Sequence, residues 1–309
     1  MNDLQTIDSP SIGATETPAP ENLLGQYIPL LYHYNMLQDA DRMGAFRQAI
    51  DLVVRPGMHV VELGGGTGIL SSFAARRGAR VTCVERNPEL VAASRRFVDL
   101  NGLSDHVTVV QADATEFVPE TPVDAVICEM LHVGLLREKQ ASVIDAFKKN
   151  YKRRFETKSS AVGLPVFIPE VSILMVQPVQ QCFDFDGYHA PVPMFQAPLQ
   201  DQPGTIPLSA LQPYASVAYH ETIPQRFQIE RQSAVENGGC LNAVRFVTQN
   251  VLTVDEAAQH AITWPNQCLV LPIDGPVDVS PGRLVDLRFD YHAGGDVDAL
   301  QESLSVRAT

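Results

Sequence analysis

Between residues 58 and 128, short apolar runs alternate with segments whose apolar residues recur at helical spacing. Buried strands are predicted at MHVVEL (58–63), VTCV (81–84), VTVV (107–110) and DAVIC (124–128). ILSSFAARR follows the first of these runs and predicts a helix. Strands that alternate with helices indicate βαβ units and a parallel sheet, which binds ligands at the carboxyl ends of its strands.

A further helix is predicted between the second and third strands, in NPELVAASRRFVDLNG. Its apolar residues at helical spacing are Leu90, Ala93, Phe97 and Leu100. Asn101-Gly102 is a favourable stop and predicts where this helix ends.

After about residue 165 the pattern changes to short β-branched runs separated by turn residues. These runs are VFIPEVSILMVQPV, LNAVRFVTQNVLTV, QCLVLPI and RLVDLRFDYH. They predict an antiparallel sandwich or barrel. A Pro- and Gln-rich excursion from Asp184 to Pro213 interrupts them, and its apolar residues call for burial: Met194, Phe195, Leu199 and Leu211. An excursion of this length is usually functional or an interaction element. We expect its prolines to prevent sheet pairing, so that its apolar residues need another surface.

Composition narrows the classes of partner. The chain has 309 residues and a net charge of −13, which argues against nucleic acid and is compatible with a cationic substrate. The five cysteines are scattered, so we expect reduced thiols and no metal site. Residues 1–22 are polar and rich in Pro, Ser and Thr, which predicts a disordered tail and no secretory signal. No apolar run is long enough to span a membrane, so we expect a cytoplasmic protein.

The stretch VVELGGGTG is the strongest single signal for a cofactor. A strand runs into glycines at 64, 65, 66 and 68, where the backbone can approach a ligand closely. The dinucleotide fingerprint G-x-G-x-x-G does not fit, because Gly68 comes one residue too soon. The spacing, with Glu62 at the end of the strand, resembles motif I of class I S-adenosylmethionine methyltransferases. NAD binding remains the alternative.

Two more carboxylates follow the next two predicted strands. Glu85 ends VTCVE, where a carboxylate can accept both hydroxyls of a ribose. Asp113 follows VTVVQAD, where it can accept the amino group of an adenine. The three strand ends together predict a site for S-adenosylmethionine.

Longer stretches resemble protein arginine methyltransferases. They are YHYNMLQDADRMGAFRQAI, ELGGGTGILSSFAARRGARVTCVE, NGLSDHVTVVQAD, ICEMLHVGLLREK, IPEVSILMV and ITWPNQ. The resemblance covers nearly everything from about Leu23 onward. It implies a Rossmann-like cofactor domain with an N-terminal helix over 23–165, and a β-barrel substrate domain over 166–309. It also implies a dimerisation arm at about 184–213 and a homodimer.

In that family two glutamates nine residues apart form a loop that grips a guanidinium, and Glu129 and Glu138 match this spacing. Carboxylates bind the planar guanidinium bidentately. Two close anions can also hold one of its nitrogens in line with a sulfonium methyl group. The resemblance therefore implies that Glu129 and Glu138 are catalytic and bind substrate. The alternative for Glu138 alone is a surface acid at a helix start.

The resemblance implies further site residues. On the cofactor side they are His33, Met36, Arg42, Glu62, Gly64, Gly66, Glu85, Arg86, Asp113, Ala114 and Glu129, with Arg42 on the cofactor carboxylate. On the substrate side Tyr27, His132 and Trp264 join the two glutamates. His132 can also be a solvated loop residue. Asp39 falls where the family pairs an aspartate with a histidine, or it belongs to the acidic first turn of a helix.

The departures from the family lie on the substrate side. Thr263 stands at the histidine position, Leu23-Leu24 replaces an aromatic pair, and Pro29 interrupts the first helix. Leu131-His132-Val133 replaces Met-Gly-Tyr between the glutamates. We therefore favour methylation of free arginine or an arginine-like metabolite, as in specialised bacterial biosynthetic members, over an arginine-containing peptide. A protein arginine methyltransferase and a catalytically inactive cofactor-binding scaffold are the alternatives.

Overall fold

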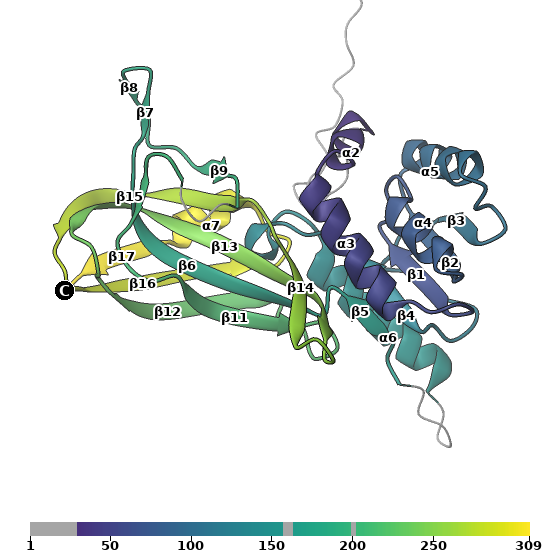
Figure 1. The fold of residues 1–309 in the computed structure, drawn as a ribbon. Coiled ribbons are helices and arrows are strands. Elements are labelled where there is room, and N and C mark those ends of the chain that lie inside the picture. Colours follow the sequence, from purple (N-terminus) through teal and green to yellow (C-terminus); the bar gives the residue numbers. More distant parts are fainter. Residues whose placement is uncertain (1–29, 157–162, 199–201) are drawn as a thin grey trace, which may run out of the picture.

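The computed structural model describes residues 30–156, 163–198 and 202–309. They form a parallel α/β part and an antiparallel β part that lie side by side (Figure 1). This architecture confirms the predicted fold class. Within the described ranges, no helix is long and apolar enough to cross a membrane.

Among the described residues, two helices precede the first strand. They are α2 (Leu30–Met36) and α3 (Ala40–Val53), so the block expected as one cofactor-covering helix divides in two. The break falls at Asp39, whose carboxylate accepts a hydrogen bond from the Arg42 backbone N–H at 2.9 Å and caps α3. Such a cap satisfies one of the free N–H groups at the start of a helix. Tyr27, Leu23-Leu24 and Pro29 lie outside the described residues.

The parallel sheet has the strand order β3-β2-β1-β4-β5. Its strands are β1 (His59–Leu63), β2 (Arg80–Glu85), β3 (Val107–Gln111), β4 (Ala125–Cys128) and β5 (Val166–Ile168), and all neighbours are parallel. The first four confirm the predicted strands. Because β1 lies between β2 and β4, the chain order reverses there, and the loops after β1, β2 and β4 meet at one edge.

Three helices connect these strands: α4 (Ile69–Arg76), α5 (Pro88–Leu100) and α6 (Gln140–Phe155), with a short 3-10 turn, η1 (Val133–Leu135), before α6. The predicted apolar face of α5 is only partly right. Leu90 is buried, but Leu100 is 73% exposed. The buried face continues instead through Val91, Ser94 and Val98. Small Ser94 can be buried because its side chain lies against the glycine-rich loop, next to Gly68.

The antiparallel part contains a seven-stranded and a three-stranded sheet, together with a two-stranded hairpin. Its strands are β6 (Val171–Gln181), β7 (Asp184–Phe185), β8 (Tyr188–His189), β9 (Met194–Gln196), β10 (Thr205–Pro207), β11 (Gln212–Ala218), β12 (Arg226–Ala234), β13 (Gly239–Asp255), β14 (His260–Pro265), β15 (Cys268–Val279), β16 (Leu284–His292) and β17 (Ser305–Ala308). Helix α7 (Val297–Ser303) lies between the last two. Tyr214 and Phe246 of the larger sheet meet Phe289 of the smaller sheet edge-on, which fills the space between the sheets.

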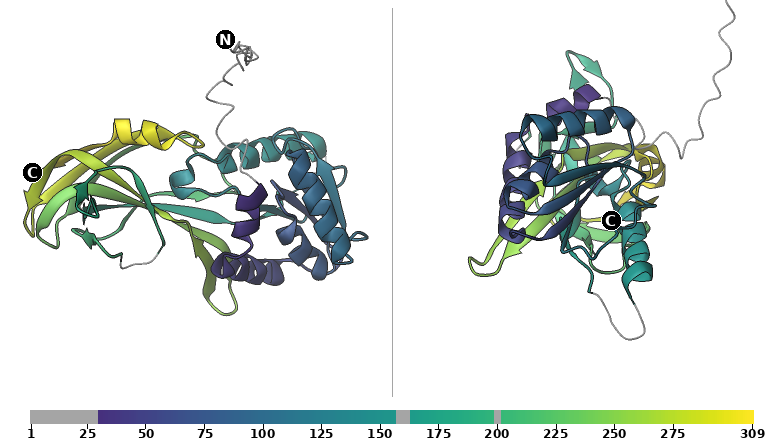
Figure 2. Two further views of the ribbon diagram at one scale, coloured as in Figure 1. Left: turned by 90° about the horizontal axis from the view of Figure 1, so that it is seen from above. Right: turned by 90° about the vertical axis from the view of Figure 1, so that its right-hand side faces the viewer.

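The excursion after β6 is not a free arm. Met194 to Gln196 pair with β15, and Thr205 to Pro207 pair with β6, although we expected the prolines to prevent sheet pairing. The prolines lie outside these pairs, except Pro207 at the end of β10. Within this excursion, the β7–β8 hairpin projects from the barrel (Figures 1 and 2).

Several contacts hold the parallel part against the barrel, and two of them involve helices α3 and α6. Phe46 of α3 lies 6.1 Å from Trp264 of β14, measured between ring centroids. Lys148 of α6 is buried and donates to the carbonyl oxygens of Tyr219, at 2.8 Å, and Glu221. All five cysteines are free thiols, as predicted.

Candidate active site

A cavity of about 440 Å³ opens at the carboxyl edge of the parallel sheet. All eleven residues predicted for the cofactor line it: His33, Met36, Arg42, Glu62, Gly64, Gly66, Glu85, Arg86, Asp113, Ala114 and Glu129. The sequence therefore identified the residues that this edge of the sheet brings together.

The glycine-rich loop forms the floor of this cavity because side chains would not fit there. Gly66 has a φ of 53°, and a Cβ on Gly65 would lie 2.2 Å from the Cys83 sulfur. Glu62 is buried, and its carboxylate accepts bonds from the backbone N–H of Ser71, at 2.8 Å, and from the Ser71 hydroxyl. Burial raises the pKa of Glu62 to about 7, although these hydrogen bonds act to lower it. Glu62 thus holds the start of α4 against the loop.

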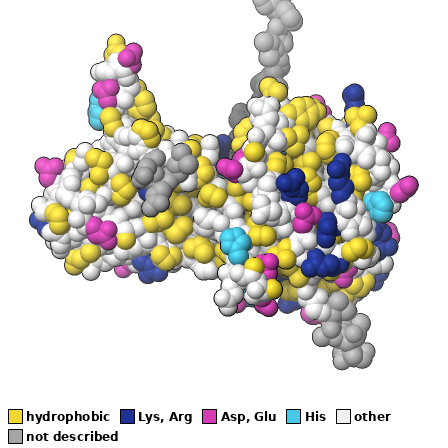
Figure 3. Space-filling model, viewed as in Figure 1, with side chains coloured by type: hydrophobic (Ala, Val, Ile, Leu, Met, Phe, Trp, Pro, Cys, Tyr) yellow, Lys and Arg dark blue, Asp and Glu magenta, His cyan; other side chains and the backbone are white. Residues whose placement is uncertain are grey.

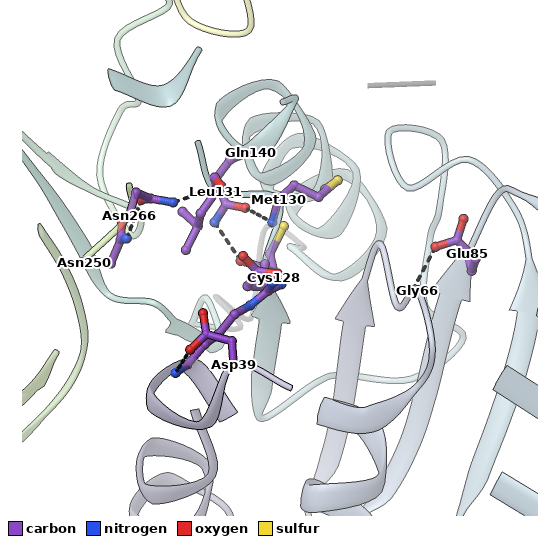
Figure 4. A network of polar contacts seen from close by, with 11 residues as sticks. Asp39, Gly66, Glu85, Cys128, Met130, Leu131, Gln140, Asn250 and Asn266 are labelled. Carbon is purple, nitrogen blue, oxygen red and sulfur yellow. Dashed lines mark hydrogen bonds and ion pairs between the residues drawn. The ribbon is translucent and has the colours of Figure 1, made fainter. Parts of the chain in front are cut away.

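Glu85 is fixed by the backbone around it. Its Oε2 accepts from the Gly66 N–H at 2.9 Å (Figure 4). Its Oε1 accepts from the Asn87 N–H at 2.8 Å. A carboxylate has about four acceptor positions, so two are left for a ligand in the cavity.

Asp113 is held in a similar way by the N–H and the hydroxyl of Thr115, at 2.9 and 2.6 Å. Its other oxygen lies 3.2 Å from the Arg86 guanidinium. Burial pushes the pKa of Asp113 upward, but the bonds from Thr115 and the charge of Arg86 outweigh it, so the pKa is lowered. Asp113 is therefore an ionised acceptor beside the cavity.

Arg42 and Glu129 form a buried ion pair. The Arg42 guanidinium also lies over the Trp264 ring, 5.5 Å from its centroid. Its Nε is buried without a hydrogen-bond partner among the described residues. Burial lowers the pKa of Arg42, although nearby carboxylates oppose the shift. A buried donor without a partner is costly, so this guanidinium is suited to receive another anion.

A second cavity, of about 270 Å³, lies on the barrel side. Four residues line both cavities: Met36, Arg42, Glu129 and Glu138. Among the other residues of the second cavity are His132 and Trp264, two of the predicted substrate contacts. The two glutamates therefore stand where the two cavities meet.

Glu138 differs from Glu129 in its surroundings. Within the described ranges, its carboxylate makes neither an ion pair nor a hydrogen bond. Burial raises its pKa to about 7, against the opposing charges of Arg42 and Arg137. Such a carboxylate would be stabilised strongly by a cation placed beside it.

His132 is not a solvated loop residue, which was the alternative to a substrate contact. Its ring meets Phe195 of β9 edge-on, with ring centroids 5.4 Å apart. Burial lowers the pKa of His132 to about 4, so the ring is neutral at pH 7. Phe195 was expected to need another surface, but it packs here on its own chain and remains 42% exposed. Thr263 is exposed.

Sequence reasoning missed several residues that hold the site together. Gln140 binds the backbone on both sides of Glu129, and Asn266 binds the Leu131 carbonyl (Figure 4). A glutamine at a helix start and an asparagine after a strand carry no signal of their own. Thr115 could have been found, because a threonine two residues after an aspartate is well placed to cap it.

Comparisons with known proteins agree with this geometry. Residues 60–153 match the family described as a methyltransferase domain. The chain has the class I S-adenosylmethionine-dependent methyltransferase fold, and this class implies S-adenosylmethionine as the cofactor. Both statements confirm the sequence predictions.

Among its relatives, the chain is 29% identical to an uncharacterized protein of Methanothermobacter thermautotrophicus, over 88% of this chain and 97% of the relative. It is 35% identical to an arginine N(omega)-methyltransferase of Streptomyces achromogenes, over 35% of this chain and 31% of the relative. A structure of the Trypanosoma brucei PRMT1 enzyme–prozyme complex with AdoHcy covers 89% of this chain and 96% of its own, with a TM-score of 0.67 at 17% identity. Arabidopsis thaliana protein arginine methyltransferase 10 covers 84% of this chain and 87% of its own, with a TM-score of 0.68 at 19% identity. The chain is thus similar to arginine methyltransferases.

Proposed function

We propose that this methyltransferase transfers the methyl group of S-adenosylmethionine to a nitrogen of a guanidino group, on free arginine or an arginine-like metabolite. The observation that carries the proposal is the pair Glu129 and Glu138 at the junction of the two cavities. One cavity suits the cofactor, and the other then receives the methyl acceptor.

The first cavity fits the cofactor by the chemistry of its side chains. The unpartnered Nε of Arg42 suits the cofactor carboxylate, Glu85 the ribose hydroxyls and Asp113 the adenine amino group. When bound, the cofactor supplies an electrophilic methyl group on a sulfonium.

The second cavity suits a guanidinium. Arg42 demonstrates that a guanidinium can lie against Glu129 and the Trp264 ring at once. Glu138 offers a second, unpaired carboxylate, which can orient the reacting nitrogen. With a pKa raised to about 7, Glu138 can also accept the proton that this nitrogen loses on methylation.

A small substrate is favoured by the second cavity. Its volume is about 270 Å³, and Phe195 of β9 together with His132 forms part of its lining. A retained pair of buried glutamates speaks against the inactive scaffold. The similarity to protein arginine methyltransferases keeps an arginine-containing peptide as the second candidate.

Labelled cofactor separates these candidates. The protein is incubated with methyl-labelled S-adenosylmethionine and either free arginine or an arginine-rich peptide, with the Glu138→Gln variant as control. We expect label in free arginine with the wild type alone. Label only in the peptide would favour the second candidate, and cofactor binding without any label would favour the scaffold.

We also propose that the protein forms a homodimer through the β7–β8 hairpin. The hairpin carries two exposed aromatic residues, Phe185 and Tyr188, together with the carboxylates of Asp184 and Asp186. Lys and Arg side chains gather on the visible face of the parallel part (Figure 3). The exposed arginines of α3, α4 and the segments that follow them are Arg47, Arg55, Arg76 and Arg77. An acidic, aromatic hairpin complements such a face, and twofold dimers are the commonest oligomers.

A further inference from the structure

The backbone at Glu129 is clamped from within the parallel part by one side chain. Gln140, the first residue of α6, is completely buried. Its Nε2 donates to the Cys128 carbonyl at 2.7 Å, and its Oε1 accepts from the Met130 N–H at 2.9 Å. The amide therefore bonds the peptide groups on either side of Glu129 (Figure 4).

The barrel holds a peptide group further along the same loop. Asn266 donates to the Leu131 carbonyl at 3.0 Å and accepts from Asn250 at 2.8 Å. Asn250 in turn accepts from the Ser172 hydroxyl at 2.7 Å. All four residues that form this series of hydrogen bonds are buried: Leu131, Asn266, Asn250 and Ser172.

The second clamp extends to a tyrosine. The Tyr219 hydroxyl lies 2.7 Å from the Ser172 hydroxyl. Tyr219 is itself completely buried. Buried polar groups that are fully satisfied in this way rigidify the structure around them.

We propose that Gln140 is the positioning residue of Glu129. It lines neither cavity, so it acts on ligands only through the loop. The side-chain amide supplies both the donor and the acceptor that these two peptide groups need. The peptide plane fixes the direction in which the Glu129 side chain leaves the backbone, and a small misplacement of a catalytic group is costly. This inference rests on the proposed guanidino methyltransferase function.

The test compares Gln140→Met with a matched variant on the same helix. Tyr151 of α6 is also buried, and its hydroxyl bonds the Val123 peptide group, at the opposite end of β4. Tyr151→Phe thus removes a similar clamp away from Glu129. We expect Gln140→Met to lower kcat/KM by about 10- to 100-fold, with cofactor affinity retained and with Tyr151→Phe near wild type. Equal losses in both variants would overturn the proposal.

A double-mutant cycle shows whether Gln140 acts through Glu129. If it does, Gln140→Met should cost little further activity in a Glu129→Gln background, because the oriented charge is already gone. Should the two losses instead multiply, Gln140 contributes by another route and the assignment is wrong.

Hydrogen exchange provides a readout that needs no turnover. The Met130 amide should exchange faster in Gln140→Met than in the wild type, and unchanged exchange there would refute the clamp. If the wild type methylates no guanidino compound but Met130 loses protection, the proposed function fails while the clamp stands. Gln140→Glu, which keeps the acceptor for Met130, should retain that protection and serves as the second variant if Gln140→Met does not fold.

Discussion

Glu138 leads to a prediction about how kcat/KM depends on pH. A carboxylate with an ordinary pKa would not lead to the same prediction. Its pKa is raised to about 7 by burial, from a usual value of 4.5. If the ionised form binds the guanidinium, the competent fraction of free enzyme is about one tenth at pH 6 and nine tenths at pH 8. We therefore expect kcat/KM to rise about tenfold over this range. A carboxylate with its usual pKa would give an almost flat profile.

The assay must separate Glu138 from other groups that titrate nearby. Burial lowers the pKa of His132 to about 4, so His132 does not become charged as pH falls from 8 to 6, and burial also lowers the pKa of His33. Glu62 does titrate there, because burial raises its pKa to about 7. The pH profiles of kcat/KM should therefore rise between pH 6 and 8 in both the wild type and Glu62→Gln, whatever the absolute rate of the variant.

Glu138→Gln completes the argument. The change keeps the size of the side chain and removes its charge, so we expect about 100-fold lower turnover, equivalent to about 2.7 kcal/mol, and a flat profile. Calorimetry should find the cofactor affinity retained. A flat wild-type profile between pH 6 and 8, or near-normal turnover of the variant, would refute the reasoning.

Three further predictions concern other parts of the molecule. Glu85→Ala removes a charged acceptor, so calorimetry should report cofactor binding weaker by about 1.5–3 kcal/mol, and an unchanged affinity would reject its assignment. Sedimentation equilibrium should give twice the chain mass for the wild type and a shift toward monomer for Tyr188→Asp; a monomeric wild type at micromolar concentration would end the dimer proposal. Because the folded pKa of Glu62 is raised to about 7, its stabilising contribution is present below the usual 4.5 and is lost as pH rises through 7. Urea unfolding between pH 5 and 8 should show that Glu62→Gln lacks this pH-dependent part of the free energy of unfolding, which amounts to up to roughly 3 kcal/mol. An equal pH dependence of stability in the wild type and the variant would contradict the prediction.

The cofactor side could be predicted because local sequence determines it. Strand, glycine-rich turn and strand-end carboxylates are each readable over a few residues, and the parallel sheet brings Glu85 and Asp113 to one edge without further information. Glu129 and Glu138 were predicted from their spacing after a strand together with the resemblance to protein arginine methyltransferases.

The rest depends on contacts between distant segments. Phe195 was expected on another surface because nothing in the sequence shows that β9 pairs with β15 and meets His132. Leu100 was placed on the apolar face of α5 because spacing alone does not show that the last residue of the helix lies in solvent. Gln140 could not be identified, since its importance arises only from the two peptide groups that it meets.

The ion pair between Arg42 and Glu129 has a thermodynamic consequence for the order in which ligands bind. An anionic cofactor group that draws Arg42 toward itself leaves Glu129 without its internal cation, and an external guanidinium then meets less competition there. The affinities of the two ligands are therefore linked through one side chain, and linkage is reciprocal. Each ligand should tighten the binding of the other by the same factor.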